Sequence, residues 1–320
     1  MVRRGRQRLS GWLCKERFST LTGVRPLRSL VSYLAVVFLG GALVAPWLYG
    51  AAQWGGEHVA ALRGVAERPF HQYVSRALQG LAVLGLWPLL KGTGLRSWWG
   101  IGLGKPDWGK LGSGFALGLV SMALVAAGVL LAGARVMSLD SARVGQVLLG
   151  AGSTAAAVAV LEEAVFRGAL FGALRQVQPW RTALAVSSTV YALVHFFERT
   201  EYTAPVRWTS GLELLPQMLR GFGEVQTLIP GFLNLFLAGA ILGLAYQRTG
   251  NLYVSIGMHG GWIFWLKSYR AFTRPVAESN PWLWGTHKLI DAWIALPVLL
   301  VCLLVLSLAK WPGRQSTVPR

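Results

Sequence analysis

Eight apolar runs, each long enough to cross or nearly cross a bilayer, constrain this chain more than any other feature of its sequence. They lie near residues 30–49, 73–90, 111–134, 144–166, 182–197, 229–247, 252–269 and 289–309. A transmembrane helix needs about 20 predominantly apolar residues, because the hydrocarbon core is about 30 Å thick. Only 14% of the 320 residues are charged, against about 25% in soluble domains. We therefore expect an all-α, polytopic transmembrane helical bundle of about eight spans.

Basic residues are distributed unevenly along the chain, and this predicts its orientation. Of the 31 Lys and Arg residues, eight fall within the first 28 positions, ahead of the first apolar run. Cytoplasmic flanks collect such residues because they face anionic lipid. We expect a basic cytoplasmic arm (1–29), a single membrane domain (30–310) and a short tail (311–320), with both termini inside. The basic segment 267–288, on the predicted outer side, is the exception.

The net charge of +18 does not indicate nucleic-acid binding, because no soluble basic face accompanies it. The expected partner of the basic arm is membrane lipid. Cys14 and Cys302 have neither the number nor the spacing of a disulfide framework or a zinc ribbon. The first apolar run is long enough to be retained as a helix rather than cleaved as a signal peptide. These features predict an integral, multi-pass protein of the cell (inner) membrane.

Pairs of small residues four apart recur inside the predicted spans. Such pairs let the backbones of membrane helices approach closely, and they therefore predict one compact bundle. The pairs are Gly114/Gly118, Gly168/Gly172, Gly239/Gly243 and Gly257/Gly261.

Three ionisable residues, Glu162, Glu163 and Arg167, fall within six positions of the fourth apolar run. A charge at the centre of a span costs about 2.5–3.5 kcal/mol on insertion scales. Three such residues close together therefore indicate either pairing between them or a function. Glu163 and Arg167 are four apart and can pair on one helix face. Glu162 lies about 100° around the helix and points elsewhere, where a poorly neutralised carboxylate suits general-base work. The alternative is a salt-bridge network that only packs helices.

Two histidines also fall within predicted spans. His195 lies four residues after Tyr191 at the end of the fifth run, and His259 lies in the seventh run. A single such histidine is usually a hydrogen-bonded side chain without a catalytic role. Together with Glu162, however, two imidazoles can bind and polarise a water. The same three residues have the composition of an open His2Glu metal site, which stays an alternative.

The order Glu162-Glu163-x-x-x-Arg167, then Tyr191-x-x-x-His195, then His259 resembles the CPBP (CAAX protease and bacteriocin-processing, or Abi) family of glutamic intramembrane proteases. The resemblance covers about residues 145–270. It implies that Glu162 and His195 activate a water and that His259 stabilises the oxyanion. Glu163 and Arg167 would then be structural. The family uses no cofactor or metal in this reaction.

Two positions depart from the family pattern. Tyr191 stands where the second motif usually has Phe. Ile263 stands four residues after His259, where a small or polar residue is usual, and it cannot donate a hydrogen bond. If a second oxyanion donor is needed, Asn234 in the sixth run is the candidate.

The resemblance predicts an intramembrane endopeptidase that processes the C-terminal region of membrane-anchored or prenylated proteins or peptides. Removal of a C-terminal sorting signal and maturation of a small secreted peptide fit equally well. Two other functions stay open. One is a catalytically silent family member that binds a partner or confers immunity, which Ile263 favours. The other is an ion-coupled transporter with a Glu, Arg and His relay; the absence of an internal repeat argues against it.

Overall fold

The computed structural model describes residues 28–95, 97–198, 200–286 and 288–309. The basic arm with Cys14 and the tail 311–320 lie outside this range, apart from the last residues of the arm. The bounds of the elements are, in chain order, η1 (Val36–Gly40), α2 (Gly41–His58), η2 (Ala60–Leu62), α3 (Arg63–Ala66), α4 (Phe70–Gly92), α5 (Trp108–Leu131), β1 (Arg135–Met137), η3 (Ser141–Arg143), α6 (Val144–Glu163), η4 (Ala164–Phe171), α7 (Gly172–Leu174), α8 (Trp180–Val194), α9 (Ser210–Gln217), η5 (Met218–Phe222), α10 (Val225–Thr249), α11 (Tyr253–Phe272), β2 (Thr273–Pro275), α12 (Pro281–Trp284) and α13 (Ala295–Leu308).

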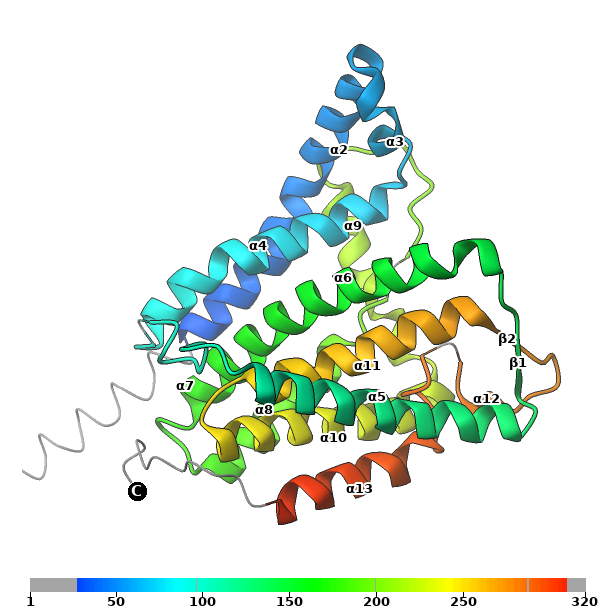
Figure 1. Ribbon diagram of the computed structural model, residues 1–320. Coiled ribbons are helices and arrows are strands. Elements are labelled where there is room, and N and C mark those ends of the chain that lie inside the picture. Colours follow the sequence, from blue (N-terminus) through cyan, green and yellow to red (C-terminus); the bar gives the residue numbers. More distant parts are fainter. Residues whose placement is uncertain (1–27, 96, 199, 287, 310–320) are drawn as a thin grey trace, which may run out of the picture.

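The fold is helical, as predicted, and helices occupy the predicted apolar runs. In the described part of the chain, 4 helices are long and apolar enough to cross a membrane: Arg28–His58, Trp108–Leu131, Ser141–Leu174 and Val225–Thr249. The long helices alternate in direction, and the first helix begins on the side of the bundle where α13 ends (Figure 1). The number of eight spans and the inward orientation of both ends stay predictions.

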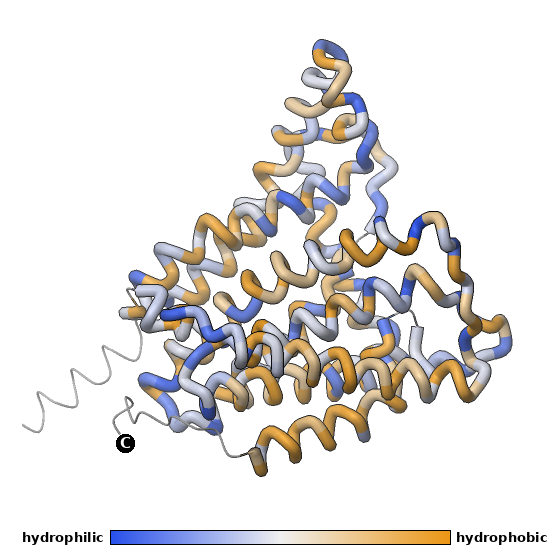
Figure 2. Tube along the Cα trace, in the orientation of Figure 1, coloured by the Kyte–Doolittle hydropathy of each residue, from blue (hydrophilic) through white to orange (hydrophobic). Residues whose placement is uncertain are grey.

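Two of the predicted spans are shorter as helices than their apolar runs. Helix α8 has 15 residues and α13 has 14. Helix α13 begins only at Ala295, because turns precede it and Leu289 there has a φ of 55°. Its residues are nevertheless hydrophobic along most of its length (Figure 2).

The two-stranded ribbon of β1 and β2 was not predicted. Its strands pair antiparallel, with Val136 opposite Arg274. The buried Arg135 guanidinium donates to the Thr273 hydroxyl and carbonyl, at 2.9 and 3.0 Å. The ribbon therefore joins the ends of α5 and α11, which run side by side (Figure 1).

Helices α5 and α11 approach so closely that their backbones touch. A Cβ atom on Gly118 would lie 2.2 Å from the Met258 carbonyl oxygen, and one on Gly114 would lie 2.3 Å from that of Val254. The reverse holds for Gly257 and Gly261, whose added Cβ atoms would meet backbone oxygens of α5 at 2.1 and 2.5 Å. The two small-residue pairs thus face each other, and the predicted close packing is confirmed at this interface.

The start of α5 lies outside this packed region and is capped locally. Asp107 accepts a hydrogen bond from the Lys110 backbone N–H at 3.0 Å and pairs with its ammonium at 2.9 Å. These hydrogen bonds from Lys110 hold the pKa of the Asp107 carboxyl below its usual value.

Candidate active site

The charged cluster lies where an α-helix changes into a π-helix. Glu162 and Glu163 end α6, and η4 follows without interruption, so that one helical segment runs from Ser141 to Leu174. The predicted run ended near 166, whereas the helix continues to Leu174. Glu162 therefore lies well inside its helical segment. π-Helical turns inside α-helices are frequent at functional sites.

Glu163 and Arg167 form the predicted ion pair and are fully enclosed. Their side chains are 0% and 3% exposed, and Arg167 Nη1 donates to Glu163 Oε1 at 2.8 Å. Arg167 Nη2 also donates to the Gly239 carbonyl of α10 at 3.4 Å. Its guanidinium lies 4.3 Å from the ring centroid of Tyr191. A buried charge persists only when it is paired and hydrogen-bonded, and these contacts meet that condition while tying η4 to α8 and α10.

His259 connects the ion pair to Glu162 through its two ring nitrogens. Its Nδ1 lies 2.8 Å from Glu163 Oε1. An ionised carboxylate only accepts hydrogen bonds, so we assign the proton of the neutral imidazole to Nδ1. The Nε2 atom lies 3.8 Å from Glu162 Oε2 and 3.5 Å from the Tyr191 hydroxyl. In the neutral ring this nitrogen carries a lone pair.

His195 reaches the same carboxylate from α8. Its Nδ1 lies 2.7 Å from the backbone carbonyl of Tyr191, and a carbonyl accepts, so Nδ1 again carries the proton. Its Nε2 lies 3.8 Å from Glu162 Oε2. The side chains of Glu162 and His195 are 26% and 30% exposed. This half of the cluster is therefore open, whereas the half around Glu163 is closed.

The arrangement brings together Glu162, His195 and His259, with Tyr191 beside them. Glu162 Oε2, at 3.8 Å from both Nε2 atoms, has no hydrogen-bond partner among the described residues. Such acceptors can take both hydrogens of one water and then one of its protons. In the described part of the chain, no group of three His, Cys, Asp or Glu side chains is arranged to hold a metal ion.

Asn234 and Ile263 do not join this cluster. The Asn234 amide donates both hydrogens to backbone carbonyls ahead of α13, those of Ile290 at 2.8 Å and Ala292 at 2.7 Å. Ile263 packs on an apolar cluster that contains Phe171. The geometry therefore supports neither Asn234 as an oxyanion donor nor a role for Ile263 at the reacting atoms. The sequence did not single out the Tyr191 hydroxyl as a hydrogen-bond donor. The signal for it was a tyrosine at a position where the family usually has phenylalanine.

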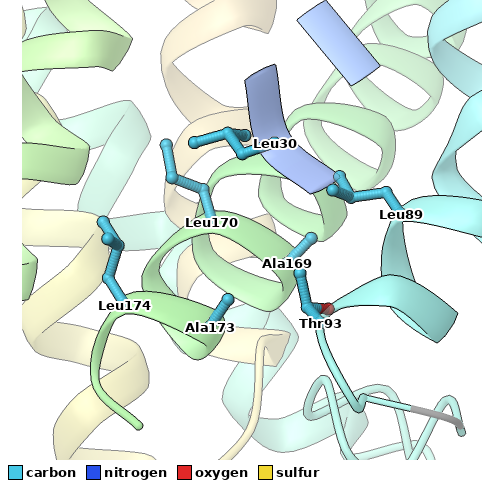
Figure 3. A pocket seen from close by; sticks show the side chains of 7 residues that line it. All are labelled: Leu30, Leu89, Thr93, Ala169, Leu170, Ala173 and Leu174. Carbon is cyan, nitrogen blue, oxygen red and sulfur yellow. The ribbon is translucent and has the colours of Figure 1, made fainter. Parts of the chain in front are cut away.

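A separate apolar cavity lies on another face of the same helical segment (Figure 3). Its volume is only about 10 Å³. Its lining residues are Leu30, Leu89, Thr93, Ala169, Leu170, Ala173 and Leu174. None of the clustered acids and histidines lines it, so it is not where the polar chemistry takes place.

Fold and cluster together define a class, a helical integral membrane protein with a buried carboxylate–histidine site. Residues 144–265 match the family model "Rce1-like", which is described as type II CAAX prenyl endopeptidase Rce1-like. This segment carries the whole cluster, and its match supports the CPBP family of CAAX proteases that the motifs resemble. Substrates of such a protease are membrane-associated proteins or peptides. Comparisons with curated proteins and with solved structures found no match.

Proposed function

We propose that this protein is a glutamic intramembrane endopeptidase in which Glu162 and His195 activate a water for attack on a peptide bond. The observation that supports this most is the position of Glu162 Oε2, 3.8 Å from Nε2 of both His195 and His259. Glu162 Oε2 and His195 Nε2 are acceptors that can orient a water without any covalent step on the protein. The Glu162 side chain is 26% exposed while that of its neighbour Glu163 is fully buried, which suits Glu162 as the base and Glu163 as a structural residue.

The charges of the cluster suit the proton transfers of this reaction. With both carboxylates ionised and both imidazoles neutral, the two acids and Arg167 together carry one uncompensated negative charge. The water gives one proton to Glu162 as its oxygen bonds to the carbonyl carbon, and this proton neutralises the cluster. Glu162 then passes the proton to the leaving nitrogen when the C–N bond breaks. His195, whose Nδ1–H is held by the Tyr191 carbonyl, keeps its Nε2 directed at the water throughout.

The proposed substrates are proteins or peptides whose C-terminal segment is membrane-associated. The matched family is described as a CAAX prenyl endopeptidase, so a farnesylated CAAX peptide is the first probe. Removal of an unprenylated membrane anchor would use the same chemistry. Cleavage of the farnesylated peptide and of its unprenylated counterpart, compared at equal concentration, separates the two substrate classes. We further propose that the protein works in the cell (inner) membrane.

The test is Glu162→Gln in purified, detergent-solubilised protein, with Glu278→Gln as its control. Gln keeps the size of the side chain and removes the base, and general-base catalysis contributes about 10²–10⁴-fold. We expect kcat to fall by at least about 10²-fold, with an unchanged melting temperature. Glu278 is exposed in a connection and carries none of the contacts above, so its variant should match wild type. Wild-type turnover by Glu162→Gln would refute the assignment.

A further inference from the structure

The open side of the cluster has too few hydrogen-bond donors for an oxyanion. A tetrahedral intermediate needs a donor aimed at the oxygen that becomes negative. Neutral His195 and His259 have both placed their N–H hydrogens elsewhere, on the Tyr191 carbonyl and on Glu163. Their Nε2 atoms, which face Glu162, therefore accept and do not donate. The carboxylate of Glu162 only accepts as well.

Three other donor side chains near the cluster already have acceptors. Arg167 donates to Glu163 and to the Gly239 carbonyl. Trp262, one turn beyond His259, donates its indole N–H to the Ser121 hydroxyl at 2.9 Å. Both amide hydrogens of Asn234 hold backbone carbonyls. The hydrogens used in these contacts are not free to bind a developing negative charge.

The Tyr191 hydroxyl differs from all of these groups. It lies 3.5 Å from His259 Nε2, at the long limit of a hydrogen bond, so its proton leaves this acceptor at little cost. Its residue is 3% exposed, and the ring is held by Phe166 edge-on at 5.1 Å. The Arg167 guanidinium lies 4.3 Å from the ring centroid. A fixed positive charge over this ring favours negative charge that develops in its neighbourhood.

We infer that the Tyr191 hydroxyl is the oxyanion donor of this site, an inference that rests on the proposed peptidase function. At rest it donates to His259 Nε2, and in the reaction it turns its hydrogen to the substrate carbonyl oxygen. No bond of the tyrosine forms or breaks. The donor thus comes from α8, one turn before His195, and neither Asn234 nor the position of Ile263 is needed.

The experiment is Tyr191→Phe, which deletes one oxygen and keeps the ring against Phe166 and Arg167. With the farnesylated CAAX peptide as probe, we expect kcat to fall about 10²–10³-fold, as for loss of one oxyanion donor, with KM unchanged. The matched control is Ser188→Ala on the same helix. It removes a buried hydroxyl without a hydrogen-bond partner in the described residues that packs against Gly239, and it should keep full activity.

A phosphinate analogue of the same peptide distinguishes a donor from a residue that only positions His259. Its tetrahedral group carries the oxyanion, and a true donor stabilises it as it stabilises the transition state. In Tyr191→Phe we therefore expect its inhibition constant to rise by the same factor by which kcat/KM falls. If Tyr191 only positioned His259, its replacement would instead shift the pH profile of the reaction. The inhibition constant would then not rise by the factor by which kcat/KM falls.

Each outcome bears on the inference. Wild-type kcat in Tyr191→Phe, or a loss of activity in Ser188→Ala alone, overturns it. If Glu162→Gln is inactive while Tyr191→Phe is fully active, only the donor assignment fails and the peptidase function stands. If wild-type protein cleaves neither peptide and does not bind the phosphinate, both fail together.

Discussion

Replacing Gly118 by Ala tests whether the contact between α5 and α11 sets the position of His259. The added Cβ would lie 2.2 Å from the Met258 carbonyl oxygen, and real Cβ contacts are essentially never under 3.0 Å. The helices must therefore separate by at least about 0.8 Å, the difference between these two distances. Met258 immediately precedes His259, so the displacement falls on the residue that bridges Glu163 and Glu162.

Two consequences follow from this displacement. Overpacking of a filled interface costs about 1–3 kcal/mol, which lowers the melting temperature in detergent. A catalytic group misplaced by about 1 Å costs about 10²-fold in rate, so we expect kcat/KM for the farnesylated peptide to fall by tens of fold or more. Both are measured on the same preparation, by a thermal melt and by product formation.

The control for Gly118→Ala is Gly112→Ala on the same helix. An added Cβ there meets nothing within 4 Å, and Ala in a helix is favoured over Gly by about 1 kcal/mol. Gly112→Ala should melt no lower than wild type and keep its activity. If Gly118→Ala behaves like Gly112→Ala in both measurements, the interface does not position His259 and the reasoning is refuted.

Two further substitutions probe how buried polar groups are held. Arg167→Met leaves the enclosed Glu163 carboxylate without its partner, and breaking such a pair costs about 3–5 kcal/mol; a thermal melt should show this loss, and adding Glu163→Gln should recover part of it. If the single and double variants melt alike, the pair is not the source of the cost. Asn234→Ala leaves two buried carbonyls before α13 without donors, at about 1–3 kcal/mol each. Faster hydrogen exchange of residues 288–294 is the expected sign, and unchanged exchange there would contradict it.

The helices were predictable from hydropathy, but their ends were not. Apolar runs mark where a helix lies because lipid accepts no unpaired backbone. The run 144–166 underestimates its helix, because Arg167 lowers the hydropathy of a segment in which Glu163 pairs with its charge. The run 289–309 overestimates its helix, because Asn234 holds the carbonyls of Ile290 and Ala292 in a turn. Both errors come from contacts between distant segments.

The residues of the candidate site were predictable as a set, while their individual contacts were not. The spacing of Glu162, His195 and His259 along three apolar runs, read with the family resemblance, singled them out. Which nitrogen of each imidazole faces Glu162 depends on acceptors elsewhere, namely Glu163 and a backbone carbonyl. The role of the Tyr191 hydroxyl could not be predicted either, because it depends on the hydrogen bonds that the neighbouring donors already make.

The length of α8 determines how deep in the bilayer a peptide bond would be cut. Its 15 residues extend about 22 Å at 1.5 Å per residue, less than the hydrocarbon thickness of about 30 Å. If α8 starts at one membrane surface, His195 ends it before the far surface, and the irregular chain that follows must lie within protein or beside water. In the proposed peptidase, α8 would then set a fixed distance between that surface and the water beside His195. A substrate would be selected by how far its bond lies from the point where its chain enters the lipid.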